Sequence, residues 1–92
     1  MLRITTDRQG ATYRIQLHGN LAGDGVDVLE RHWRTIRERA PWAPVTVVVA
    51  DVGFIDADGE AVLRRIADAG AEFEGSGIMN RYIIEKISTG LR

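Results

Sequence analysis

Residues 45–66, VTVVVADVGFIDADGEAVLRRI, decide the fold, because an apolar run passes through a cluster of carboxylates into an amphipathic segment. Residues 45–49, Val-Thr-Val-Val-Val, are all β-branched. So continuous an apolar run predicts a strand buried on both faces rather than a strand with one wet face. We expect this strand to end near Ala50 or Asp51.

A turn and then a helix are predicted after this strand. The residues of the turn are Asp-Ala-Asp-Gly at 56–59. From Glu60 onward, apolar residues recur at helical spacing, and Gly70 supplies a plausible C-terminal stop. Asp56 or Asp58 is expected to cap this helix, because a carboxylate there accepts a free backbone N–H and meets the positive end of the helix dipole.

The same segment resembles the centre of STAS domains, the family that includes bacterial anti-sigma-factor antagonists and the cytoplasmic tails of sulfate transporters. The resemblance rests on DVGFIDADG at residues 51–59, followed by a helix that begins Glu-Ala-Val-Leu. The sequence HGNL at residues 18–21 resembles the end of a family strand, and residues 26–40 and 70–73 fit the family's first helix and next strand. The resemblance therefore implies a single STAS-like domain over residues 1–92.

One departure from the family concerns a hydroxyl group. In the antagonists the turn typically reads Asp-Ser-Ser/Thr-Gly, and a hydroxyl residue between Asp and Gly is phosphorylated by a partner kinase. Here those two positions are Ala57 and Asp58. Phosphorylation adds about −1.5 to −2 charge, so Asp58 supplies part of that charge permanently. We expect a contact surface that is held in one electrostatic state and is not switched by a kinase at this turn.

The resemblance also implies which residues contact a protein partner. They are the turn equivalent to the phosphorylation site and its neighbours: Gly53, Phe54, Asp56, Ala57, Asp58, Gly59, Glu60 and Arg64.

Response-regulator receiver domains are a second resemblance, because VVVAD at residues 47–51 is similar to their phosphoacceptor strand. On that interpretation Asp51 would accept a phosphoryl group beside a divalent cation. A receiver, however, has an acidic pair after its first strand and a lysine after its fifth, in a longer chain. The sole lysine here is Lys86, within a helical pattern near the C-terminus, and no acidic pair lies near the N-terminus.

Composition limits the remaining functions. The chain has 92 residues, 45% hydrophobic and 27% charged, with a net charge of −1 and no cysteine. A charge so close to zero argues against nucleic acid or an anionic membrane as the partner, and the lack of cysteine excludes disulfides and thiol catalysis. No run approaches the roughly 18 apolar residues of a membrane span, and the N-terminus does not resemble a signal peptide. We expect a soluble, cytoplasmic protein that inserts into no membrane.

The fold class predicted for the chain is α/β, a mixed four-stranded sheet with helices mainly on one face. A hairpin is followed by two crossovers, which gives the order β-β-α-β-α-β-α. Outside the central segment the predicted elements are strands at 2–7 and 13–18 around a turn at 8–10, a loop at 19–25 in which Asp24 caps a helix at 26–40, a strand at 71–74 and a helix at 79–87.

The chain lacks a catalytic pattern. His18 and His32 share no spacing with each other or with a carboxylate that would suggest a zinc site. No phosphate-binding Gly-rich motif or nucleophile elbow occurs. We therefore expect no enzyme activity, cofactor or metal.

The resemblance to STAS domains, together with the lack of a catalytic pattern, implies a protein-binding module of the anti-sigma-factor-antagonist type. The partner that the resemblance implies is an anti-sigma factor with a kinase-like ATPase domain. Three alternatives stay open at this point: an accessory STAS subunit of a membrane transport ATPase, which would co-purify with membranes, a receiver-like phosphoacceptor at Asp51, and a homodimer.

Overall fold

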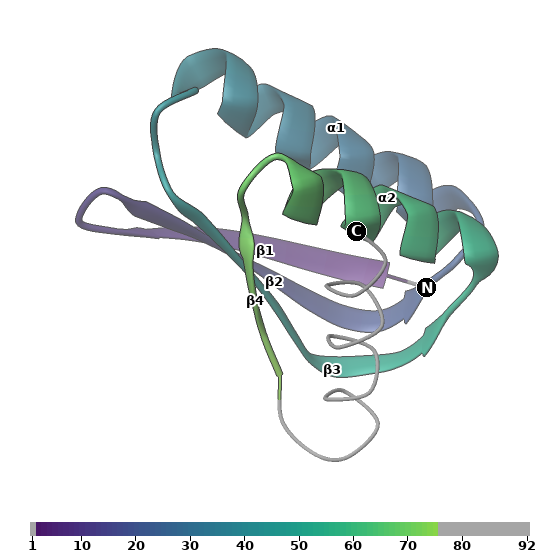
Figure 1. Cartoon of the computed structure of the whole chain (residues 1–92). Helices are drawn as coiled ribbons and strands as arrows, with labels where there is room; N and C mark the ends of the chain where they lie inside the picture. The colour runs from purple at the N-terminus through teal and green to yellow at the C-terminus, as the bar shows by residue number, and fades with distance from the viewer. Residues whose placement is uncertain (1, 76–92) are drawn as a thin grey trace.

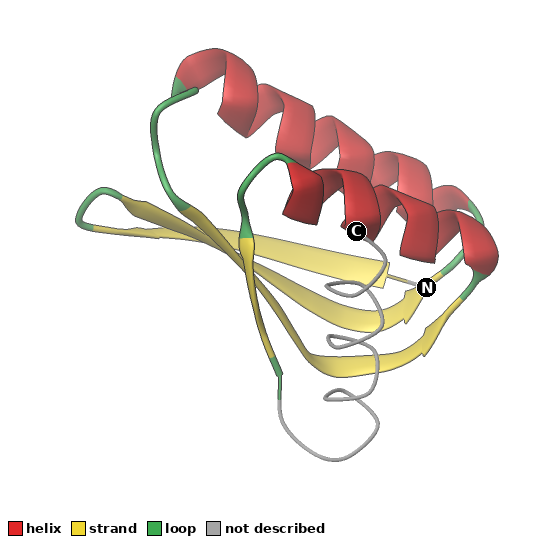
Figure 2. Ribbon diagram, in the orientation of Figure 1, coloured by secondary structure: helices red, strands yellow, loops and turns green. Residues whose placement is uncertain are grey.

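Two helices lie on one face of a twisted four-stranded sheet in the computed structural model, which describes residues 2–75 (Figures 1 and 2). The strand order is β1-β2-β3-β4, with β1 antiparallel to β2 and the two other neighbouring pairs parallel. The elements are β1 (Leu2–Gln9), β2 (Thr12–Leu21), α1 (Asp24–Arg39), β3 (Val45–Ile55), α2 (Ala57–Asp68) and β4 (Glu72–Glu74). The predicted mixed α/β sheet is confirmed, whereas the helix predicted at 79–87 lies outside the described residues.

The β1–β2 hairpin turns later than the sequence predicts. Its strands pair from Leu2↔Gly19 to Gln9↔Thr12, so the turn is Gly10-Ala11 and not residues 8–10. Gly10 has φ 62, a conformation that glycine adopts without the steric cost of a side chain.

Strand β2 also runs further than predicted, through the first part of the expected loop at 19–25. Gly19 and Leu21 pair with residues of β3, and the register shifts between Gly19 and Asn20. Gly19 has φ 107 at this irregularity. The glycine thus marks a bend within a strand, whereas the sequence pattern indicated that the strand had ended.

Strand β3 corrects two predictions. It continues past Ala50 and Asp51 to Ile55, because residues 51–55 remain paired with the extended end of β2. Burial along its first half alternates: Val45, Val47 and Val49 are buried, whereas Thr46 and Val48 are only partly covered. The apolar run therefore fills one face of the sheet, the face under the helices, and is not buried on both.

Both helices begin earlier than predicted. The N-cap of α1 is Gly23, with no side-chain hydrogen bond, so the prediction that Asp24 caps this helix is wrong. Helix α2 begins at Ala57, so the predicted turn at 56–59 is in fact the N-cap and first turn of the helix. The predicted stop is confirmed, because Gly70 follows the C-cap with φ 106.

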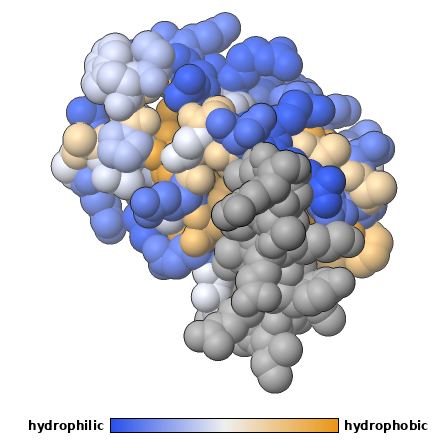
Figure 3. All heavy atoms as spheres, viewed as in Figure 1, coloured by the Kyte–Doolittle hydropathy of each residue, from blue (hydrophilic) through white to orange (hydrophobic). Residues whose placement is uncertain are grey.

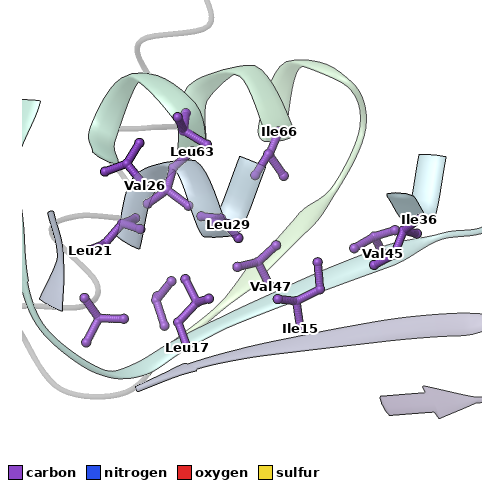
Figure 4. Close-up of a cluster of buried hydrophobic side chains, with 13 residues drawn as sticks. Ile15, Leu17, Leu21, Val26, Leu29, Ile36, Val45, Val47, Leu63 and Ile66 are labelled. Atoms are coloured by element: carbon purple, nitrogen blue, oxygen red, sulfur yellow. The ribbon is translucent and has the colours of Figure 1, made fainter. Parts of the chain in front are cut away.

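The core lies between the sheet and the helices, and Figure 4 shows side chains from both layers pointing toward one another. Removing this apolar surface from water is the main favourable contribution to folding, at roughly 25 cal/mol per Å². Its largest fully buried members are Ile15, Leu17, Leu21, Leu29, Leu63, Ile66, Val47 and Val49.

On the opposite face of the sheet, Arg14 of β2 reaches across β3 to Glu74 of β4. Two guanidinium nitrogens of Arg14 donate to the two carboxylate oxygens of Glu74, both at 3.1 Å. This hydrogen bonding and charge lower the pKa of Glu74 and raise the pKa of Arg14. The pair fixes β4, the shortest strand, to a strand with which it shares no backbone ladder.

We predict that acid weakens the attachment of β4. A carboxyl group with a lowered pKa in the folded protein stabilises the fold above its ordinary value of 4.5, and this contribution is lost as the pH falls through the lower, folded value. The unfolding temperature of Glu74→Gln should therefore be lower than that of the wild type at pH 7 and should converge with it in acid. Thermal unfolding followed by circular dichroism from pH 7 down to pH 3 tests this, and a constant difference across the range would contradict it.

Candidate functional site

Asp56 occupies the junction between β3 and α2 and caps the helix. Its backbone is extended, and its Oδ1 accepts the N–H of Gly59 at 2.7 Å. Its carbonyl oxygen accepts the N–H of Glu60 at 2.9 Å, the first hydrogen bond of the helix. The prediction that Asp56 or Asp58 caps this helix is confirmed, and the residue is Asp56.

The second carboxylate oxygen of Asp56 joins α2 to the start of α1. Oδ2 accepts the N–H of Gly23, the N-cap residue of α1, at 3.2 Å. The backbone N–H of Asp56 donates to the carbonyl oxygen of Leu21, the last residue of β2, at 3.1 Å. One residue therefore connects the ends of two neighbouring strands to the beginnings of both helices.

Gly59 permits this close approach. It is buried, and a Cβ atom at this position would lie 2.5 Å from the carbonyl oxygen of Leu21. Real Cβ atoms do not come so close to backbone oxygen, so α2 could not seat against the end of β2 with any side chain here. The glycine of the predicted turn is thus required by packing and not by a positive φ.

Asp58 stands in the first turn of α2 and is exposed to solvent. No hydrogen bond or ion pair within residues 2–75 uses its carboxylate. The helix dipole favours a negative charge here. Because Asp56 already satisfies the cap, the carboxylate of Asp58 is available to a molecule approaching from outside.

The other predicted contact residues differ in how far they are exposed. Phe54, near the end of β3, is 55% exposed, one of two large apolar side chains that the described chain leaves in solvent. Gly53 and Ala57 are also exposed. Among the predicted contact residues, an aromatic ring and a carboxylate are therefore both exposed.

Arg64 is less available for contact with a partner than the sequence suggests, because its side chain is already paired. Its Nη2 donates to Oε1 of Glu60 at 3.1 Å, one helical turn earlier. Its side chain is 42% exposed, and its Nε is buried without a hydrogen-bond partner among residues 2–75. The arginine and Glu60 thus form a partly covered pair at the margin of the surface.

Asp51 lies inside β3 rather than at its end, and its side chain is paired. Oδ2 of Asp51 is 3.2 Å from Nδ1 of His18, the residue opposite it on β2. Sequence spacing alone does not reveal this contact, because it depends on the shifted register between the two strands. Within residues 2–75, no three His, Cys, Asp or Glu side chains gather where they could hold a metal ion.

The outer surface of the helices is largely hydrophilic in the view of Figure 3. Neither described helix is long and apolar enough to cross a membrane.

Comparison with known proteins shows a likeness in structure and none in sequence. No family model matches the chain, and no curated protein matches it. Among solved structures, the anti-sigma factor antagonist SpoIIAA in its unphosphorylated form superposes with a TM-score of 0.65 at 13% identity, over 90% of this chain and 82% of that one.

Two further structures share the fold. An uncharacterized protein of the DUF3478 family with a SpoIIAA-like fold, from Shewanella loihica, gives a TM-score of 0.62 at 10% identity and covers 97% of this chain and 79% of that one. The protein Mglu gives 0.62 at 20% identity over 80% of this chain. The chain spans only 19% of the length of Mglu. The predicted STAS-like fold is confirmed, and identities this low show the fold alone.

We predict that Gly59→Ala destabilises the protein by about 1–3 kcal/mol, because the added methyl group forces α2 away from the end of β2. The matched control is Gly53→Ala, whose Cβ would lie 3.7 Å from Oδ1 of Asn20, an ordinary contact. Urea unfolding measures both. In an exposed helix Gly→Ala is stabilising by about 1 kcal/mol, so a gain in stability for Gly59→Ala would contradict the packing argument.

We also predict that Asp56→Ala costs more than an ordinary N-cap, about 2 kcal/mol or above, since it leaves two N–H groups without their acceptor. Asp58→Ala, which removes an exposed carboxylate that caps nothing, should change stability by less than about 0.5 kcal/mol. Urea denaturation of the two variants compares them directly. Equal losses would show that Asp56 does not have the linking role described above.

Proposed function

We propose that this protein is a binding module of the anti-sigma-factor-antagonist type, whose partner contacts the surface around the first turn of α2. The surface comprises Phe54, Ala57 and Asp58, with Gly53 beside it and Glu60 and Arg64 at its margin. The single observation that carries the proposal is the exposed Asp58, which caps nothing, at a helix start on a SpoIIAA-like fold.

The exposure of both an aromatic ring and a carboxylate supports a role in protein binding. Large aromatic side chains, Phe among them, are enriched in protein interfaces, where each contributes a large buried apolar area. Phe54 would supply that area, while Asp58 would select a partner with a complementary positive charge and would steer its approach. A partner of this kind, by resemblance, is an anti-sigma factor with a kinase-like ATPase domain.

A fixed charge distinguishes this module from a phosphorylated switch. A phosphoserine carries about −1.5 to −2 charge and three acceptor oxygens, whereas Asp58 carries one charge and two oxygens. We propose that the surface stays in one intermediate electrostatic state, so that its binding is not regulated at this turn. The protein would act in the cytoplasm by binding alone, without catalysing a reaction.

The test begins with capture of the partner from native lysate and its identification by mass spectrometry. Calorimetry with the purified partner then compares the wild type with Asp58→Ala and Asp58→Lys. We expect Asp58→Ala to weaken binding several-fold and Asp58→Lys by more than tenfold, because reversal of an interfacial charge replaces attraction with repulsion. A tenfold change corresponds to about 1.4 kcal/mol.

Glu38→Lys is the matched control, since Glu38 is exposed near the end of α1 and its reversal changes the net charge by the same amount. Its affinity should equal that of the wild type. In the presence of a cognate kinase, Asp58→Ser should gain a phosphoryl group. Unchanged affinity in all Asp58 variants would leave the residue without a role in binding and refute the proposal.

A further inference from the structure

We infer that strand β1 is a pairing edge for a second copy of this chain, joined antiparallel about a two-fold axis at Thr5. The pairing would join two sheets into one continuous sheet. It is independent of the α2 surface, which lies toward β3, two strands away from β1.

The first observation is that β1 presents free backbone groups. It is one of the two edge strands of the described sheet, and no described strand lies on its outer side. The N–H of Tyr13, opposite Arg8, donates to Pro44 at 3.0 Å, so it points toward β3 and away from β1. By the alternation of an antiparallel ladder, the N–H and C=O groups of Leu2, Ile4, Thr6 and Arg8 point to the open edge.

The second observation is the pattern of side chains on β1. Leu2 and Ile4 pack against the core, so Arg3, Thr5 and Asp7 lie on the opposite face of the sheet. Edge strands normally carry charges that prevent indiscriminate pairing. Here the two charges on this face have opposite signs and stand equally far from Thr5.

This spacing selects one register. With Thr5 on the two-fold axis, Arg3 of each copy lies opposite Asp7 of the other, which gives two opposite-charge pairs. A register centred on Ile4 would place Arg3 opposite Thr5, and a register centred on Thr6 would place Asp7 opposite Thr5, so both would leave the charges unmatched. Opposite charges directly across strands stabilise pairing by roughly 0.2–1 kcal/mol for each pair.

A hollow beside β1 supplies the third observation. It has a volume of about 400 Å³, lies between α1 and the β1–β2 hairpin, and is lined in part by Tyr13, Val28 and Ile36. Thr6 lines it from β1. In the selected register, Ile4 of the second copy stands opposite Thr6, so its apolar side chain would cover the hollow.

Arg31 and Arg39 also line this hollow. Their positive charges oppose the pairing, because the second copy brings the same two arginines. Both arginines are exposed, so the repulsion is screened by solvent. One strand pair and one small hollow also bury less area than a typical stable dimer requires. The association should therefore be reversible and should depend on concentration.

Sedimentation equilibrium of the wild type should show a monomer–dimer equilibrium. Thr6→Pro removes an outward N–H without removing a bond to β2, so it should abolish the dimer and preserve the circular dichroism spectrum. This variant should also keep the wild-type affinity for the partner captured through the α2 surface. Loss of the dimer can thus be distinguished from loss of partner binding.

Charge reversal tests the register. Arg3→Asp alone and Asp7→Arg alone each place like charges opposite one another in a homodimer, and each variant should be monomeric. In a mixture of the two, every charged pair is again of opposite sign, so a heterodimer should form. Failure of the mixture to associate would overturn the register.

Crosslinking tests the axis, because the chain contains no cysteine. Thr5→Cys places two thiols at a non-hydrogen-bonded pair, where Cα atoms lie about 4.5 Å apart, within the range of a disulfide. Oxidation should give a covalent dimer, whereas Thr46→Cys on the interior strand β3 should not. A wild type that is monomeric at every concentration, or a dimer that survives Thr6→Pro, would overturn the inference.

Discussion

The two hydrogen bonds accepted by the carboxylate of Asp56 determine how the helices are placed on the sheet. One oxygen receives the N–H of Gly59 in α2 and the other receives the N–H of Gly23 at the start of α1. Both helix starts carry unsatisfied backbone donors, and a single ionised acceptor serves both. The arrangement requires the end of β2 to lie against α2, which Gly59 allows because it has no side chain to strike the carbonyl oxygen of Leu21. The starts of both helices are therefore fixed to the ends of β2 and β3 at one position.

The two aspartates at the start of α2 differ in role, since Asp56 holds the fold and Asp58 does not. Asp56 is partly covered and occupied by backbone donors, whereas Asp58, two residues later, is exposed in the first helical turn. A helix start favours negative charge over its whole first turn, so the helix dipole also favours a second carboxylate there. The stability of the helix start consequently does not depend on Asp58. Selection for binding could change that position without disturbing the position that holds the helices.

Local patterns in the sequence were sufficient for the element types, and long-range contacts explain where they failed. The helix predicted at 26–40 and the stop at Gly70 depend on neighbouring residues, and both are found, although α1 begins two residues earlier than predicted. The predicted end of β3 is wrong because residues 51–55 are held by pairing with β2, which lies more than thirty residues earlier in the chain. The link from Asp56 to Gly23 and the contact between His18 and Asp51 are invisible for the same reason. The sequence restricts the N-cap of α2 to Asp56 or Asp58. Only the packing of α2 against Leu21, a long-range contact, shows that the cap is Asp56.

The extension of β2 and β3 beyond their predicted ends has a consequence for function. If β3 ended at Asp51, the residues before α2 would form a loop without strand pairing, and Phe54 would not be held in position. Because Asn20↔Phe54 and Leu21↔Ile55 are paired, the backbone beside Asp56 is fixed in a ladder and Phe54 is held outward, 55% exposed. An aromatic side chain on a rigid strand loses little conformational entropy when a partner covers it, which favours binding over a similar ring on a loop. The strand pairing that extends β3 beyond its predicted end therefore also preorganises the surface proposed to bind a partner.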